Sequence, residues 1–322
     1  MKKLKISSLW GAGYGTVYNS ILISIIKKLS NSKVIFSDPS DCDILILGPY
    51  NIETISEKFF KFFKKKVPFN ILKKNIEKYE RKILFRRNSP LTIFYSTENT
   101  RQDSIEADFK ITQDLGVNSK NHLRIPVWKE NIDWSKEGFF RENNLSLKGK
   151  NYKYHNIIRF GEFYSLEKLM SPLSKNFLNK EKEFCIITSH LKEPRKSIYD
   201  IFNQNFLVDG FGPYFDNTIK NHNSSNFTKK EILMNYKFNL CPQNSSYPGY
   251  FEERVPEAFL CDCLPVTWAD NNIEHDFNPA SFINLNNYIN SSYKEIIEKL
   301  KDQNYLRSFI DQPLLLKKPN LD

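Results

Sequence analysis

The stretch that decides the fold is Tyr236–Asn284, which reads YKFNLCPQNSSYPGYFEERVPEAFLCDCLPVTWADNNIEHDFNPASFIN. Its apolar run 238–241 has the length and content of a buried parallel strand. A polar loop follows, and from residue 250 to 263 the apolar residues recur at helical spacing. A second apolar run, 264–268, predicts another strand. The order strand, loop, helix, strand is one βαβ crossover.

This crossover also predicts where a ligand binds. In a βαβ unit, ligands lie beyond the carboxyl ends of the parallel strands, where the N-terminus of the helix offers free N–H groups to an anion. The loop that follows the first strand carries polar side chains, among them Asn244 and Ser245. The first helical turn holds Glu252, Glu253 and Arg254. The polar start of the helix therefore faces the loop.

The same residues resemble the signature of the α-1,3/4-fucosyltransferases, which are inverting glycosyltransferases that use GDP-fucose, and especially their bacterial members. The matching pieces are Tyr236–Cys241, Asn244-Ser245, Gly249-Tyr250, Glu253 with a basic residue after it, Pro265–Trp268, Asp276–Pro279 and Ser281–Asn284. Weaker matches at Phe94–Asn99, Leu123–Pro126 and Pro194-Arg195 extend the resemblance over most of the chain. The identification depends on the C-terminal half.

The chain also departs from the family pattern at several positions. Pro242-Gln243 stands where the family usually has Phe-Glu, and Glu252 stands where Thr is usual. Arg254 replaces the usual Lys, and Ala269 replaces Gly. The resemblance implies that the donor chemistry is kept, and these positions bear on which sugar is transferred.

Strands and helices alternate in the N-terminal half as well. The strand candidates are 4–6, 34–36, 44–47 and 93–95, and a helix is expected over 16–29. Together with the resemblance, this alternation predicts an α/β fold of two Rossmann-like domains facing a cleft, the GT-B type. We expect an acceptor-binding domain at 1–180, with a linker near 150–180. A GDP-sugar-binding domain at 181–322 then opens with a strand at 184–189 and a helix at 197–205.

The chemistry of the transfer predicts the donor-side residues. Without a bound metal, the protein must neutralise the leaving diphosphate with cations and helix N–H groups. Arg195 and Arg254 are the candidates, because a guanidinium binds two phosphate oxygens in a fork. The family positions imply that Asn244 and Tyr250 line the same pocket and that Glu253 accepts hydrogen bonds from donor hydroxyls. Neither a metal nor any other cofactor is expected besides the donor GDP-fucose.

Inversion in a single displacement needs a general base on the face opposite the leaving group, and hence from the other domain. Glu98 is the candidate, because it lies just past the strand 93–95 in a family-like context. A carboxylate has an ordinary pKa near ~4.3, so partial burial that raises the pKa would make it a better base. Asp103 and Glu106 are the rival carboxylates.

Three further motifs have two readings each. The glycine-rich turn Gly11–Gly15 could hold a phosphate or could be a tight strand-to-helix turn. Asp41-Cys42-Asp43 spells the Asp-x-Asp pattern of metal-dependent glycosyltransferases, but it stands before a strand and is interpreted as a polar loop. The chain has five cysteines, the last two at Cys261 and Cys263. They lack the paired spacing of a zinc site, so we expect them to be buried free thiols.

Residues 58–87 carry twelve Lys or Arg against two Glu, so this segment alone accounts for a charge of +10, equal to the formal net charge of the chain. Phenylalanines at 59, 60, 62 and 63 are interleaved with lysines. This composition suits either contact with an anionic membrane surface or a helix that packs two phenylalanines inward and solvates its lysines. No nucleic-acid module is found, and no apolar run reaches the roughly 20 residues that span a bilayer.

The resemblance implies that the enzyme transfers L-fucose from GDP-fucose to a hydroxyl of an N-acetylglucosamine-containing glycan, such as a lipopolysaccharide or another surface polysaccharide. A cytoplasmic location is expected, with peripheral contact at the inner face of the cytoplasmic membrane through 58–87. A transferase that uses another GDP-sugar is the nearest alternative. A nucleotide-sugar or polysaccharide binding protein without turnover is the alternative from a different class.

Replacing Lys64, Lys65 and Lys66 by Glu tests the membrane reading of the basic segment. Sedimentation with anionic liposomes should fall, because each lysine near such a surface contributes about 1 kcal/mol of attraction. Turnover on a soluble acceptor should stay near that of the parent, which serves as the control. Unchanged liposome binding would support the alternative, a helix that packs two phenylalanines inward and solvates its lysines.

Overall fold

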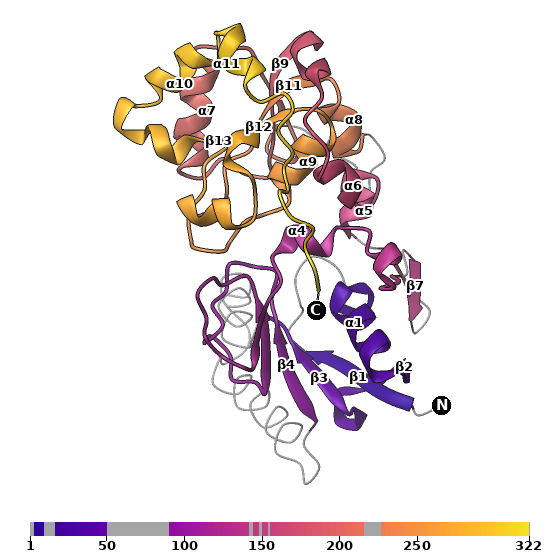
Figure 1. Cartoon of the computed structure of the whole chain (residues 1–322). Coiled ribbons are helices and arrows are strands. Elements are labelled where there is room, and N and C mark those ends of the chain that lie inside the picture. Colours follow the sequence, from indigo (N-terminus) through magenta and orange to yellow (C-terminus); the bar gives the residue numbers. More distant parts are fainter. Residues whose placement is uncertain are drawn as a thin grey trace, which may run out of the picture. The chain divides into compact units, whose positions relative to one another are not determined.

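The computed structural model describes residues 3–9, 17–49, 90–141, 144–147, 150–153, 155–215 and 227–321. They form two compact units (Figure 1). The first comprises Met1–Ile125 and Ser135–Tyr154, and the second comprises Pro126–Trp134 and His155–Asp322. Each is an α/β unit with a parallel sheet, so the predicted pair of Rossmann-like domains is confirmed.

The first unit is built on a six-stranded sheet in the order β2-β1-β3-β4-β5-β6, with parallel pairing throughout. The strands are β1 Lys3–Leu9, β2 Lys33–Phe36, β3 Ile44–Leu47, β4 Leu91–Tyr95, β5 Phe109–Thr112 and β6 His122–Arg124. Ile6, Leu45 and Ile46 are fully buried in the centre of this sheet. Such apolar central strands are typical of a sheet that is covered on both faces.

The remaining elements of the first unit are short, apart from α1. They are η1 Val17–Asn19, α1 Ile21–Ser30, η2 Pro39–Asp41, η3 Ser135–Glu137 and the antiparallel pair β7 Asn144–Leu147 and β8 Lys150–Lys153. The expected helix over 16–29 therefore begins with a 3₁₀ turn, and its α-helical part starts at Ile21. The four isoleucine and leucine residues from 21 to 25 are buried, which explains the position of the helix.

The second unit contains a five-stranded sheet in the order β10-β9-β11-β12-β13, again parallel. Its strands are β9 Lys182–Ile187, β10 Val208–Phe211, β11 Tyr236–Leu240, β12 Leu264–Thr267 and β13 Ile283–Asn284. Helix α9, Arg254–Leu260, lies between β11 and β12 in sequence, so the predicted crossover is confirmed. The core is aromatic: the ring of Phe184 stacks on Phe238 with centroids 4.6 Å apart.

Helices surround this sheet. They are α4 Val127–Glu130, α5 His155–Phe160, α6 Leu166–Leu169, η4 Lys175–Asn179, α7 Arg195–Asn203, α8 Lys229–Leu233, η5 Asn271–His275, η6 Pro279–Ser281, η7 Leu285–Ser291, α10 Lys294–Lys299 and α11 Gln303–Arg307. Helix α7 begins two residues before the expected start at 197, and this places Arg195 in its first turn.

The division between the units falls earlier than the expected boundary at 180, because residues 155–180 pack against the second sheet's helices. The Tyr164 hydroxyl donates a hydrogen bond of 3.0 Å to Glu257 in α9. Leu169 and Phe177 are fully buried in the same unit. The region expected to be a linker therefore supplies part of the second core.

Several other expectations concern this fold. The cysteines are all free and buried, as predicted. Both carboxylates of Asp41-Cys42-Asp43 bind Lys5: Asp41 pairs with its ammonium at 2.8 Å, and Asp43 accepts from its backbone N–H at 2.8 Å, which agrees with a structural role. The turn Gly11–Gly15 and the basic segment 58–87 lie outside the described residues. Within the described ranges, none of the helices has the length and apolarity needed to cross a membrane.

Candidate active site

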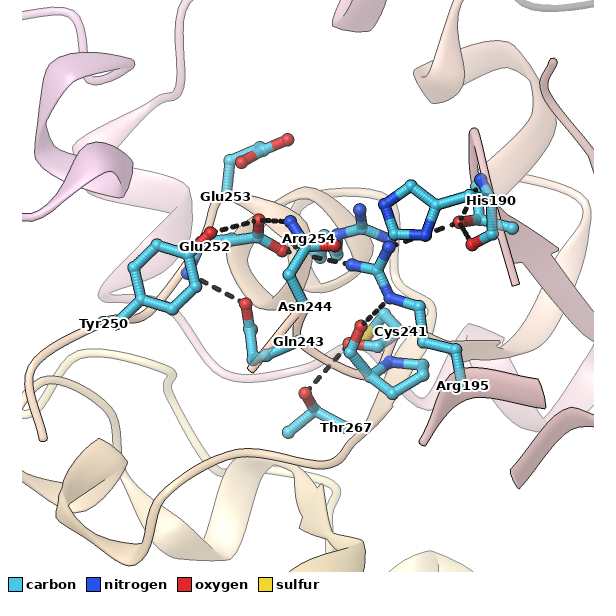
Figure 2. Close-up of polar contacts among 12 residues, drawn as sticks. His190, Arg195, Cys241, Gln243, Asn244, Tyr250, Glu252, Glu253, Arg254 and Thr267 are labelled. Atoms are coloured by element: carbon cyan, nitrogen blue, oxygen red, sulfur yellow. Dashed lines mark hydrogen bonds and ion pairs between the residues drawn. The ribbon is translucent and has the colours of Figure 1, made fainter. Parts of the chain in front are cut away.

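A cluster of polar side chains lies past the ends of β9 and β11, at the starts of α7 and α9 (Figure 2). Arg195 is the first residue of α7, and Arg254 is the first residue of α9. The loop that follows β11 contributes Asn244 and Tyr250. These positions are the ones that the βαβ geometry predicts for a ligand site. Four of the predicted donor-side residues therefore come together.

They meet at Glu252, which the sequence analysis noted only as a departure from the family pattern. Its Oε1 accepts hydrogen bonds from the Asn244 amide and the Tyr250 hydroxyl, each at 2.8 Å. Its Oε2 accepts from Arg254 Nε at 2.9 Å and lies 3.5 Å from Arg195 Nη2. We call these five residues the Glu252 cluster. A carboxylate inside a loop that also holds two predicted ligand residues was the signal that could have identified Glu252.

Arg195 is almost completely buried, with 1% of its surface exposed. Its Nε donates to the carbonyl of Pro242 at 3.0 Å, and its Nη1 donates to Thr188 Oγ1 at 3.4 Å. Its Nη2 is buried and makes no hydrogen bond within the described part of the chain. Burial, reinforced by the charge of Arg254, lowers the pKa of Arg195 to about 10. The guanidinium is therefore still charged at neutral pH and retains an N–H group for a ligand.

Arg254 is fixed from two sides. Its Nε binds Glu252, and its Nη1 donates to the carbonyl of Ile187 at the end of β9, at 3.2 Å. Burial acts against its charge, but the carboxylates of Glu252 and Glu253 outweigh this effect and raise the pKa of Arg254. The guanidinium is thus a permanent cation with a defined orientation.

Close to the arginines, two other buried nitrogen atoms lack a hydrogen-bond partner among the described residues, Gln243 Nε2 and His190 Nδ1. Gln243 is fully buried, and its Oε1 accepts from the backbone N–H of Glu252 at 3.2 Å. Burial, followed by the charge of Arg195, lowers the pKa of His190, so its imidazole is neutral at neutral pH. Because unsatisfied buried polar groups are costly, the unpaired amide N–H of Gln243 near the arginines suits a ligand rich in acceptor oxygens.

Glu253, the fifth predicted donor-side residue, lies beside this cluster but has a different partner. It pairs at 3.2 Å with Lys229, which also binds Glu257 at 2.7 Å. Burial acts to raise the pKa of Glu253, but Lys229 and Arg254 overcome it and lower the pKa to about 2. Figure 2 shows the Glu253 carboxylate pointing away from that of Glu252. Glu253 is therefore an ionised acceptor at the edge of the site.

Glu98 belongs to the first unit and lies three residues past the end of β4, as predicted. It is half-buried, whereas its rivals Asp103 and Glu106 are exposed. Its backbone N–H donates to Ser96 Oγ at 3.1 Å. The loop is also held by Gln113, whose amide donates to the carbonyl of Thr97 at 2.7 Å. Glu98 is thus the most enclosed of the three candidate bases.

Acidic and sulfur side chains do not form a metal site in the part of the chain that the structure describes. Groups of three or more His, Cys, Asp or Glu residues arranged to hold a cation are absent there.

Two parallel-sheet α/β units, with a polar site past the strand ends of the second, define the GT-B class of glycosyltransferase fold. Solved structures agree. A crystal structure of an α1,3-fucosyltransferase matches with a TM-score of 0.61 and 21% identity, covering 97% of this chain and 83% of that one. A crystal structure of an α1,3-fucosyltransferase with GDP-fucose matches with a TM-score of 0.60 and 20% identity, covering 100% and 85%.

Residues 177–310 match the family described as glycosyltransferase family 10 (fucosyltransferase) C-term. The predicted resemblance to the fucosyltransferases is therefore confirmed for this part of the chain. The chain is 27% identical over 238 residues to the alpha-(1,3)-fucosyltransferase FucT of Helicobacter pylori, covering 69% of this chain and 45% of that protein. It is 23% identical over 155 residues to a putative fucosyltransferase, R654, of Acanthamoeba polyphaga mimivirus, covering 44% and 25%. The chain thus spans less than half the length of these curated relatives.

The lowered pKa of Glu253 predicts a pH-dependent contribution to stability. A folded-state pKa of about 2, against an ordinary 4.5, means that the ionised form stabilises the fold above pH 4.5 and that this contribution is lost as the pH falls towards 2. At pH 7, Glu253→Gln should lower the free energy of unfolding of the second unit by about 1–3 kcal/mol.

Urea unfolding between pH 7 and pH 3 measures this effect. The difference between parent and variant should be constant above pH 5 and should shrink below it. Glu295→Gln is the control, because Glu295 is exposed and pairs with Lys299 at 2.6 Å on the surface. A difference that grows on acidification would show that Glu253 is not ionised in the folded protein.

Proposed function

We propose that the protein is an inverting α-1,3/4-fucosyltransferase that moves L-fucose from GDP-fucose to a hydroxyl of an N-acetylglucosamine-containing surface glycan. The observation that carries this proposal is a pair of guanidinium groups, the buried Arg195 and the partly buried Arg254, past the strand ends of a family 10 domain. A pair of fixed cations with an unused N–H group is suited to a diphosphate. The solved relative whose description includes GDP-fucose supports the choice of donor.

On the donor side, the reaction needs negative charge to be stabilised as the diphosphate leaves. Arg195 offers its buried Nη2, and Arg254 offers the part of its fork that Glu252 and Ile187 do not use. Because both groups are held in advance, little reorganisation is needed when charge develops. Asn244 and Tyr250 line the same pocket, and the ionised Glu253 accepts hydrogen bonds from hydroxyls of the sugar.

On the acceptor side, the attacking hydroxyl must lose its proton. Glu98 is assigned as the general base, because it is partly enclosed just past the end of β4 while its rivals are exposed. A single displacement on the face opposite the leaving group inverts the configuration at the transferred carbon. Neutralisation of the diphosphate by two arginines removes the need for a divalent metal, so the proposed reaction uses no cofactor other than the donor.

The acceptor and the location extend this proposal. We infer that the acceptor is a lipopolysaccharide or a related surface polysaccharide. We also infer that the enzyme works in the cytoplasm at the inner face of the membrane, where the segment 58–87 would contact anionic lipid. No nucleic-acid partner is proposed. Transfer from another GDP-sugar, or binding of a nucleotide sugar without turnover, are the alternatives that the experiment must separate.

Donor choice is tested with a panel of nucleotide sugars. GDP-fucose should raise the thermal midpoint of the purified protein and should be slowly hydrolysed without an acceptor, and both effects should persist in EDTA. UDP-galactose is the control and should give neither. Equal shifts with UDP-galactose would contradict the proposal, stabilisation without hydrolysis or transfer would indicate a binding protein, and loss of activity in EDTA that manganese restores would reveal a metal.

The role of Glu98 is tested by Glu98→Gln, which keeps the size of the side chain but removes its basicity. Transfer should fall by about 10²–10⁴-fold, the usual effect of losing a general base. GDP-fucose affinity should barely move, because the donor is held by the other unit. Asp103→Asn and Glu106→Gln are the matched controls and should remain active. A Glu98→Gln enzyme within about threefold of the parent, or one that fails only in donor binding, would overturn the assignment.

A further inference from the structure

We propose that Glu252 is the positioning residue of the donor pocket, and that it orders the side chains that bind the donor without itself contacting the ligand. This inference rests on the proposed function, since the ligand is taken to be a nucleoside diphosphate sugar. It concerns a residue for which the family pattern has no counterpart, because threonine is usual at that position.

The contacts of Glu252 account for both of its carboxylate oxygens. Oε1 accepts hydrogen bonds from the Asn244 amide and the Tyr250 hydroxyl. Oε2 accepts one from Arg254 Nε and forms an ion pair with Arg195 Nη2. A carboxylate offers about four lone-pair sites, so these donors nearly saturate it. The side chain is also buried, with 8% of the residue exposed. Glu252 therefore acts on a ligand through its neighbours.

Glu252 is itself held in place. Its backbone N–H donates to the fully buried Gln243 side chain at 3.2 Å, and the neighbouring Phe251 and Tyr250 are buried. Since a side chain with a fixed backbone, three hydrogen-bond donors and a neighbouring guanidinium has little freedom, its position sets the position of these groups. Preorganisation of this kind is what a binding site needs from the residues that support it.

The charges of the cluster lead to the same assignment. Arg195 is a buried cation, Arg254 is a partly buried one, and Glu252 is the carboxylate that contacts both. The three together carry a net charge of +1, and the ionised Glu253 beside them is paired with Lys229. Without Glu252 the two guanidinium groups would repel each other, and their forks would lose the shared acceptor that aligns them. Binding of a diphosphate should then become weaker in spite of the extra positive charge.

Calorimetry with two probes, GDP and inorganic pyrophosphate, tests the proposal on the full chain. Glu252→Ala should weaken binding of both by at least about tenfold, the effect of losing about 1.4 kcal/mol of binding free energy. Glu252→Gln keeps acceptor and shape and should retain part of the affinity. Asp262→Asn is the matched control, because Asp262 is a partly buried carboxylate of the same unit that pairs with Lys168 at 2.7 Å, and it should bind as the parent does.

A double-mutant cycle separates positioning from general stability. If Glu252 acts in part through Arg254, then Glu252→Ala should cost less affinity in an Arg254→Ala background than in the parent. Additive losses in this cycle would overturn the proposal, as would a Glu252→Ala protein that binds GDP within threefold of the parent. Loss of folding in both Glu252→Ala and Glu252→Gln, seen by circular dichroism, would make the residue structural and would also overturn it.

The two probes distinguish this inference from the proposed function. If the parent binds pyrophosphate but neither GDP nor GDP-fucose, the proposed donor is wrong, while the response of pyrophosphate binding to Glu252→Ala still decides the role of Glu252. If the parent binds GDP-fucose and Glu252→Ala does so equally well, the proposed function stands and the positioning role falls. A parent that binds neither probe contradicts both.

Discussion

Two neighbouring guanidinium groups, Arg195 buried and Arg254 partly buried, are the constraint on which the second unit depends. Burying one charge is costly, and burying two of the same sign beside each other is possible only with carboxylates between them. The structure meets this condition with a series of side chains whose charges alternate in sign. Its members, in order of contact or close approach, are Arg195, Glu252, Arg254, Glu253, Lys229 and Glu257. The series joins the starts of α7, α8 and α9, so the site and the packing of these helices are one electrostatic unit.

The secondary structure around this series follows from local patterns. Strand β11, helix α9 and strand β12 were predicted because a short apolar run, a helical period and a second apolar run follow each other without ambiguity. The boundary of the units could not be predicted in this way. Residues 155–180 show little periodicity, and their place is decided by long-range contacts such as Tyr164 to Glu257 and the burial of Phe177. The sequence of this segment does not show which distant residues it contacts.

The site was predictable in its members but not in its organisation. Arg195, Asn244, Tyr250 and Arg254 were identified one position at a time, through the resemblance. The structure adds that two departures from the family pattern, at 243 and 252, lie against each other, since the Glu252 N–H binds the Gln243 side chain. The usual acid at 243 is replaced by an amide, and an acid is present at 252. In the folded chain these two differences lie together, and Glu252 is the carboxylate that contacts both arginines.

The two halves of the proposed reaction are supported by separate networks. On the first unit, the loop of Glu98 is held by the bond from Gln113 to Thr97 and by a pairing of Arg101 with Asp114. On the second, the donor residues share the single acceptor Glu252. Because neither network shares a residue with the other, damage to one should leave the local geometry of the other intact. Donor residues that share an acceptor should by contrast fail together, so the effects of substitutions within the Glu252 cluster should be strongly non-additive.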